Sequence, residues 1–152
     1  MKILYLSSHN ISRSIIAESI TRKYGDQNIK ALSGASHPQD DIHPVAHRIL
    51  KENRYSSTNL VSKSWDTFSG WEPDIVITLC GDVLKQKCPA YVGNSVHVHW
   101  DLPNPAKQLG NMEENFTKIF LILEKRIKNM LDVDIERMDQ TELRAHLKKV
   151  VQ

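Results

Sequence analysis

The hydrophobic pattern divides the chain into short apolar runs that alternate with segments of helical spacing. Four runs rich in β-branched or aromatic residues are bounded by turn-forming residues and predict strands at 2–6, 29–33, 74–79 and 95–100. Strands that alternate with helices form parallel sheets covered on both faces. The pattern therefore predicts an α/β fold, a three-layer sandwich around a four-stranded parallel sheet.

Four stretches between and after these runs predict helices. The first begins between Ser12 and Ser14 and ends at Gly25, and the second runs from Pro44 to Asn53. The longest spans 112–131, where large apolar residues recur at helical spacing, and a weaker helix begins near residue 139 or 141. A short segment at 64–68 has Ser64 as its expected cap.

Length and composition add limits to this picture. The 152 residues fit a single domain, 1–152, with 40% hydrophobic and 25% charged residues. The formal net charge of +2 is too small to indicate a nucleic-acid or membrane partner. The apolar start of the chain is too short for a signal peptide, and no segment approaches the roughly 20 apolar residues of a membrane span. We therefore expect a cytoplasmic protein.

The polar loop between the first strand and the first helix is the first candidate site. The segment "SSHNISRS", residues 7–14, leads from an apolar strand into a helix N-terminus. Successive backbone amides at such a turn form a concave anion site, and Arg13 adds a planar fork that grips two oxygens of a tetrahedral oxyanion. An ordinary capped turn with a surface arginine is the alternative, and the residues alone leave both open.

Two cysteines, Cys80 and Cys88, follow the third predicted strand. Without an export signal a structural disulfide framework is not expected. The residues alone favour a buried strand thiol and a surface loop thiol over a redox pair, because a spacing of eight is no recognised metal or redox signature.

The order of several motifs then resembles a known family. The pattern of Ser7, Arg13 and Ser14 resembles the Cys-x5-Arg-Ser loop of low-molecular-weight tyrosine phosphatases and of the arsenate reductases built on the same fold. The segment "SHNISRS" resembles one bacterial branch of arsenate reductases more closely than it resembles the phosphatases. That branch also resembles this chain at "SGASHP", "IHP", "SKSWD", "VITLC", "CP" and "HWDLPNPA". The resemblance covers nearly the whole chain and implies the low-molecular-weight phosphatase fold.

The resemblance implies a role for each residue of the loop. Ser7 stands where the family has its nucleophilic cysteine, and Arg13 would bind the equatorial oxygens of arsenate, phosphate or sulfate. Asn10 would brace the loop and Ser14 would hydrogen-bond residue 7. The expected oxyanion-binding residues are Ser8, His9, Asn10, Ile11, Ser12, Arg13 and Ser14.

The resemblance also implies a cysteine relay. Cys80 would attack the arsenylated nucleophile to release arsenite, and Cys88 would take over the disulfide for delivery to a reductant. The expected electron donor is thioredoxin, glutaredoxin or a small thiol such as glutathione or mycothiol, with no bound cofactor and no metal. We expect a monomer or weak dimer. His97 and His99 are interpreted as partly buried strand residues rather than metal ligands.

Two departures from the family fall on its most demanding chemical positions. Ser7 is a weak nucleophile without a base beside it, and Asn104 stands where the family has an aspartic acid that protonates the leaving oxygen. Asp101, in the same loop, is a possible substitute acid. Three explanations stay open. Ser7 is an engineered replacement of a nucleophilic cysteine, the protein is a catalytically silent oxyanion binder or regulator, or Cys80 is an alternative nucleophile. A tyrosine phosphatase is a further alternative, disfavoured because Ala106 and Lys107 follow where phosphatases present aromatic residues.

Overall fold

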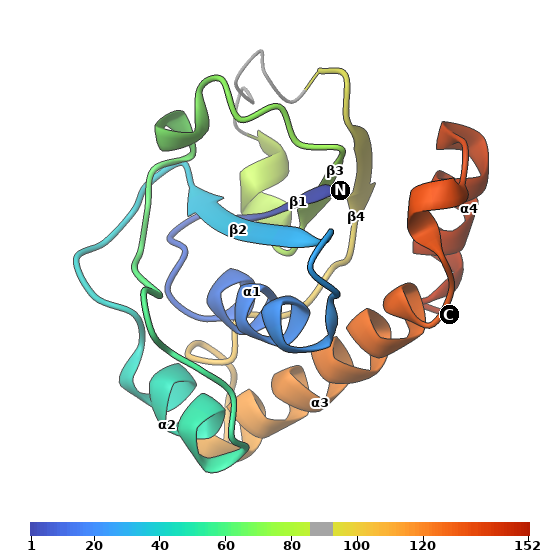
Figure 1. The fold of residues 1–152 in the computed structure, drawn as a ribbon. Coiled ribbons are helices and arrows are strands. Elements are labelled where there is room, and N and C mark those ends of the chain that lie inside the picture. Colours follow the sequence, from blue (N-terminus) through green and yellow to red (C-terminus); the bar gives the residue numbers. More distant parts are fainter. Residues whose placement is uncertain (86–92) are drawn as a thin grey trace.

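The computed structural model describes residues 1–85 and 93–152 and contains one four-stranded parallel sheet (Figure 1). The strands are β1 (Lys2–Ser7), β2 (Lys30–Ala35), β3 (Ile75–Thr78) and β4 (Val96–His99), in the spatial order β2-β1-β3-β4. The helices are α1 (Arg13–Tyr24), α2 (Pro44–Glu52), α3 (Met112–Leu131) and α4 (Gln140–Lys149), with short 3-10 helices η1 (Trp65–Phe68), η2 (Gly81–Lys85) and η4 (Ile135–Arg137). The predicted α/β class and all four strands and helices are confirmed.

The strand register brings the carboxyl ends of the strands to one edge. Ser7 pairs with Ala35 of β2, and Thr78 of β3 lies between Leu6 of β1 and His99 of β4. In a parallel sheet this edge is where loops bind ligands, because each strand there gives way to the following helix. The loop after β1 and the segment after β3 therefore open toward the same region.

The main core lies between one face of the sheet and the helices. Alternate residues of the strands, such as Ile3, Tyr5 and Ile77, pack with α1, α2 and α3 in a single buried cluster. The ribbon shows α1 directly beneath the sheet and α3 running along the far side of α1 (Figure 1). The helix α4 covers β4, where Trp100 Nε1 donates to the carbonyl of Leu147 at 2.9 Å.

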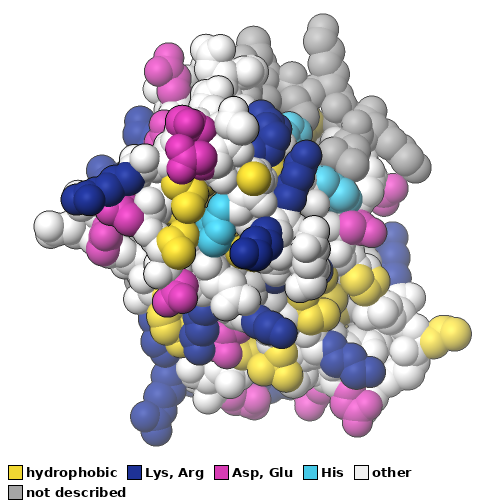
Figure 2. Space-filling view, turned by 90° about the vertical axis from the view of Figure 1, so that its right-hand side faces the viewer, with side chains coloured by type: hydrophobic (Ala, Val, Ile, Leu, Met, Phe, Trp, Pro, Cys, Tyr) yellow, Lys and Arg dark blue, Asp and Glu magenta, His cyan; other side chains and the backbone are white. Residues whose placement is uncertain are grey.

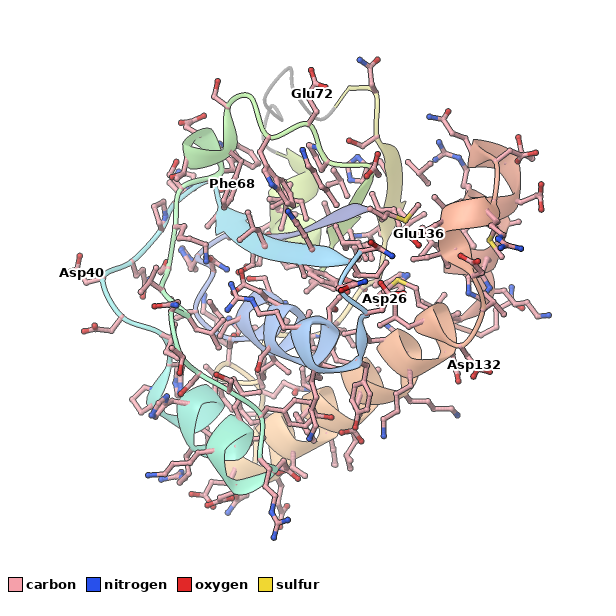
Figure 3. All side chains as sticks on the ribbon, viewed as in Figure 1. Asp26, Asp40, Phe68, Glu72, Asp132 and Glu136 are labelled. Atoms are coloured by element: carbon pink, nitrogen blue, oxygen red, sulfur yellow. The ribbon has the colours of Figure 1, made fainter. Side chains whose placement is uncertain are left out.

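The opposite face of the sheet has a smaller cover. Leu4, Leu6 and Val76 pack there against Trp65 and Phe68 of η1, so within the described residues 3-10 helices and loops form the third layer in place of long helices. Phe68 lies above the sheet on this side (Figure 3). Gly34 is required at the contact, because a Cβ there would lie 2.8 Å from the Phe68 ring.

The edge strand β4 explains the two strand histidines. Its residues alternate between buried valines and half-buried histidines, and His99 Nδ1 lies 2.8 Å from the hydroxyl of Thr78. Arg144 of α4 donates to the carbonyl of His97 at 3.0 Å, which covers the strand's outer edge. Among the described residues no group of three His, Cys, Asp or Glu side chains is arranged to hold a metal ion.

The surface around α4 mixes charges of both signs. Figure 2 shows lysine and arginine side chains interspersed with aspartate and glutamate on that face, without one continuous basic area among the described residues drawn there. Within residues 1–85 and 93–152, no helix combines the length and apolarity that a bilayer crossing requires.

Candidate oxyanion site

The loop between β1 and α1 is held by one buried asparagine in a left-handed conformation. Asn10 is fully buried with φ of 54°, a conformation that asparagine tolerates better than most residues. Its Nδ2 donates to Ser14 Oγ at 2.8 Å, and its Oδ1 accepts from the backbone N–H of Lys63 at 2.9 Å. The loop is thus fixed both to α1 and to the segment that precedes η1.

Ser7 lies at the bottom of this loop, among hydrogen-bonding groups that do not activate it. Its Oγ accepts from the backbone N–H of Asn10 at 3.1 Å and shares a hydrogen bond of 2.7 Å with Ser14 Oγ. Neither partner is a carboxylate or an imidazole, so no hydrogen-bonded group among the described residues can take the Ser7 proton as a general base. The position is shaped to stabilise an anion on residue 7.

The start of α1 presents unused backbone donors. The first hydrogen bond of the helix runs from Ile16 N to Ser12 O, and Ser12 makes no side-chain cap. Within the described part of the chain, the amides of Ile11, Ser12 and Arg13 have no acceptor. Orphan amides at a helix N-terminus favour a bound anion, since the helix dipole adds to their partial charges.

Arg13 is half-buried beside these amides. One Nη donates to the carbonyl of Leu102 at 2.7 Å, while the buried Nε has no acceptor among the described residues. Burial lowers the pKa of Arg13, and the nearby Cys80, Asp101 and Asp82 oppose that shift. An arginine stays protonated in proteins, so the guanidinium supplies a fixed charge and an unused donor.

Two cavities that share lining residues lie beside the Ser7 loop. The first, of about 210 Å³, is lined by Ser7, His9, Asn10, Ile11, Ser12, Arg13, Gln39, Asn104, Ala106 and Lys107. The second, of about 240 Å³, is lined by Ser8, His9, Arg13, Cys80, Gly81, Asp82, Leu102, Asn104 and Lys107. They share His9, Arg13, Asn104 and Lys107, so these four side chains stand between the anion loop and Cys80.

Cys80 therefore lies on the other side of the same site. Its side chain is buried, with 4% exposed, and Sγ lies 3.4 Å from Ser8 Oγ. It is a free, buried thiol two residues after β3, and its predicted redox role stays a prediction. Cys88, the second predicted relay residue, lies outside the described residues.

The structure separates the two residues considered for the acid role. Asn104 lines both cavities, whereas Asp101 lines neither and its side chain is 75% exposed. The Oδ1 atom of Asp101 lies 3.4 Å from His99 Nε2. The substitution of Asp101 for the missing acid is therefore not supported by its position.

Comparison with known proteins identifies the loop and the fold together. The family model of low molecular weight phosphotyrosine protein phosphatases matches residues 2–148. The chain belongs to this family. An arsenate reductase of Oceanobacillus iheyensis is 33% identical over 117 residues, which cover 76% of this chain and 83% of that protein. A glutaredoxin arsenate reductase of a Synechocystis species is 24% identical over 130 residues, covering 86% and 95%.

A solved structure supports the same placement within the family. An arsenate reductase in its oxidized state has a TM-score of 0.73 and 25% identity, covering 86% of this chain and 96% of that one. The predicted resemblance to arsenate reductases of the low-molecular-weight phosphatase-like family is confirmed.

Several residues that support this phosphatase-family loop were not singled out from the sequence. Ser62 Oγ donates to the carbonyl of His9 at 2.6 Å, and Lys63 Nζ lies 3.6 Å from Oε1 of the fully buried Glu18. Burial raises the pKa of Glu18 and lowers that of Lys63. The motif "SKSWD" contains Ser62 and Lys63, so the family resemblance could have indicated these two residues. No sequence pattern indicated that Glu18 is buried.

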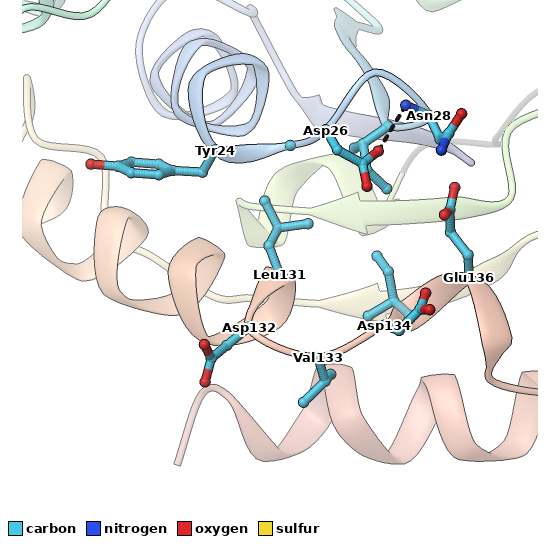
Figure 4. A pocket seen from close by; sticks show the side chains of 11 residues that line it. Tyr24, Asp26, Asn28, Leu131, Asp132, Val133, Asp134 and Glu136 are labelled. Carbon is cyan, nitrogen blue, oxygen red and sulfur yellow. Dashed lines mark hydrogen bonds between the residues drawn. The ribbon is translucent and has the colours of Figure 1, made fainter.

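A hollow elsewhere on the molecule has the wrong charge for an oxyanion. It measures about 610 Å³ between the end of α1 and the segment after α3. Figure 4 shows Asp26, hydrogen-bonded to Asn28, facing the segment that carries Asp132, Asp134 and Glu136. Asp40 lies on the outside of the connection between β2 and α2 (Figure 3).

Proposed function

We propose that this chain has the oxyanion site of an arsenate reductase and binds arsenate, phosphate or sulfate above Ser7. The observation that carries the proposal is the convergence of the orphan amides of residues 11–13 and the free Nε of Arg13 on one cavity, with Cys80 beside it. Such a donor set matches the equatorial oxygens of a tetrahedral anion.

Arsenate reduction at this site requires a thiolate at position 7. That sulfur would form a bond to arsenic as water leaves. The thiolate of Cys80 would then attack the same sulfur, so that a disulfide forms, the sulfur–arsenic bond breaks and its electron pair leaves with arsenite. Both cysteines would be oxidised by one electron each, and arsenic would be reduced by two. Ser8, whose Oγ lies 3.4 Å from Cys80 Sγ, is placed to orient the attacking thiol.

The chain with Ser7 is impaired in that reaction. A hydroxyl with no base beside it is a weak nucleophile, and an ester formed at serine cannot pass electrons to Cys80 because oxygen does not form a disulfide. Oxyanion binding without turnover is therefore the second candidate function, and Ser7 together with Asn104 favours it.

An external thiol would return the relay to its reduced state. The glutaredoxin arsenate reductase among the relatives supports a glutaredoxin system as that donor, and a thioredoxin system is the alternative. Cys88 would receive the disulfide from Cys80 and present it to the donor, by thiol–disulfide exchange through a mixed disulfide.

One experiment tests the proposal. Arsenate-dependent consumption of a thiol reductant is measured for the chain as it stands, for Ser7→Cys, and for Ser7→Cys combined with Cys80→Ser. We expect reduction only in Ser7→Cys, and sulfate binding by calorimetry in all three. Arg13→Ala should remove both properties, because it takes away the fixed charge of the site.

Hydrolysis of an aryl phosphate is measured in parallel. Turnover of the ester by Ser7→Cys that does not need Cys80 would make the protein a phosphatase and contradict the proposed reductase chemistry. Sulfate binding without turnover in any form would leave the silent binder as the function. Absence of oxyanion binding in the native chain would contradict both.

A further inference from the structure

The side chain of Asn104 has a fixed orientation within its own turn. Its Oδ1 accepts from the backbone N–H of Ala106 at 3.0 Å, and its carbonyl accepts from the N–H of Lys107 at 3.1 Å. Only the oxygen of the amide can accept the Ala106 hydrogen, so the amide cannot be flipped without losing that bond.

This orientation directs the other half of the amide away from the turn. Asn104 lines both cavities, and its Nδ2 has no acceptor among the described residues. The two N–H donors therefore belong to a residue that lines both cavities, the first of which is also lined by Ile11, Ser12 and Arg13. An aspartate would satisfy Ala106 equally well, but would place a negative charge where these donors are.

From this geometry we infer that Asn104 is a specificity-determining residue, an uncharged donor that lets the site hold a fully ionised tetrahedral oxyanion. The inference rests on the proposed oxyanion binding above Ser7 and names the charge state that the site accepts. A carboxylate at position 104 repels a dianion unless it is protonated, whereas an amide donates at every pH. With an amide at position 104 the chain cannot donate a proton to a leaving group, but it holds the ionised anion more tightly.

The charged groups around Asn104 agree with this assignment. Arg13 and His9 face it from the Ser7 loop, Lys107 lies three residues further along its own turn, and Cys80 and Asp82 line the second cavity from the segment after β3. The first cavity has no carboxylate in its lining among the described residues. A dianion there meets no like charge from the described lining residues.

The test compares Asn104→Asp with the native chain, using sulfate because it stays a dianion between pH 4.5 and 8. We expect Asn104→Asp to bind sulfate about tenfold or more weakly at pH 7.5, since a like charge at this range shifts an ionisation by one or more pKa units. The deficit should shrink as pH falls and the new carboxyl becomes protonated. Calorimetric affinities are expressed as the ratio of variant to native at each pH, which removes the contribution of His9.

Asn104→Ser is the matched control. Its hydroxyl can still accept from Ala106, but it reaches no ligand and adds no charge, so we expect a loss of about two- to tenfold that does not change with pH. The inference would be overturned if Asn104→Asp and the native chain bound sulfate equally at pH 7.5. It would also be overturned if the loss of affinity in Asn104→Asp were the same at pH 7.5 and at lower pH. Either result would leave oxyanion binding intact. If the native chain bound no sulfate, the proposed function itself would be wrong.

Discussion

The left-handed residue of the oxyanion loop gives the sharpest prediction about stability. Asn10→Ala removes the donor to Ser14 and the acceptor for the Lys63 N–H, and leaves that N–H without a partner. A stranded buried donor costs about 1–3 kcal/mol. A Cβ without asparagine's local hydrogen bonds at φ of 54° adds about 1 kcal/mol. We therefore expect Asn10→Ala to lower the free energy of unfolding by about 2–4 kcal/mol.

Asn10→Gly separates the two causes. It loses the same hydrogen bonds but not the conformational preference, because glycine adopts positive φ without a Cβ clash. We expect it to be more stable than Asn10→Ala by about 0.5–1 kcal/mol, after the larger unfolded-state entropy of glycine is subtracted. This is the reverse of the usual order of alanine and glycine.

Urea denaturation followed by tryptophan fluorescence measures all the variants. Asn59 is the control, because it is exposed, has φ of 63°, and its side chain has no hydrogen-bond partner among the described residues. Asn59→Ala should cost only the strain, about 1 kcal/mol. An Asn10→Ala variant as stable as Asn10→Gly, or within 1 kcal/mol of the native chain, would refute the assigned role of Asn10.

Three further predictions concern the supports of the fold. His43 Nδ1 accepts from Val45 N at 3.1 Å, and burial lowers the pKa of His43, so stability should fall as pH drops below 6.5. Denaturation of His43→Asn, which still caps the helix, should lack that decline. Burial raises the pKa of Glu18 above 4.5, so the stability of the native chain should decrease as pH rises from there. In Glu18→Gln, the free energy of unfolding from urea denaturation should change less with pH over the same range. Trp100→Phe leaves the Leu147 carbonyl unpaired and should cost about 1–3 kcal/mol, visible as a lower Tm by circular dichroism.

The elements were predictable because their signals are local. Strand β3 is buried throughout, and its uninterrupted apolar run predicts a strand, while the cap at Ser64 lies where the short helix η1 begins. The strand order was not stated from the sequence, since it depends on how chain segments cross over between distant strands. The extension of β2 to Ala35 was also missed, because Gly34 is a poor strand former that only its contact with Phe68 explains.

The site was predictable only where the motif itself carries the chemistry. The placement of Arg13 and Ser14 followed from the resemblance, and the hydrogen bond between Ser7 and Ser14 is present as that resemblance implied. Glu18 was not predictable, because a glutamate in a helix normally faces solvent. It is buried here since Arg22 lies 3.3 Å and Lys63 3.6 Å from one oxygen. Such pairing depends on tertiary contacts that no local pattern records.

The loop retains a shape and a set of donors that suit a bound anion. Asn10 holds a left-handed conformation, and the buried Nε of Arg13 and the amides at the start of α1 have no acceptor among the described residues. An unpaired buried donor such as the Nε of Arg13 costs about 1–3 kcal/mol, a cost that a bound anion would remove. Under the proposed function, Ser7 and Asn104 would lower reactivity and would leave every one of these donors in place. The physical chemistry of the loop therefore favours the proposed oxyanion binding, and Ser7→Cys is the substitution that tests whether the chain also reduces arsenate.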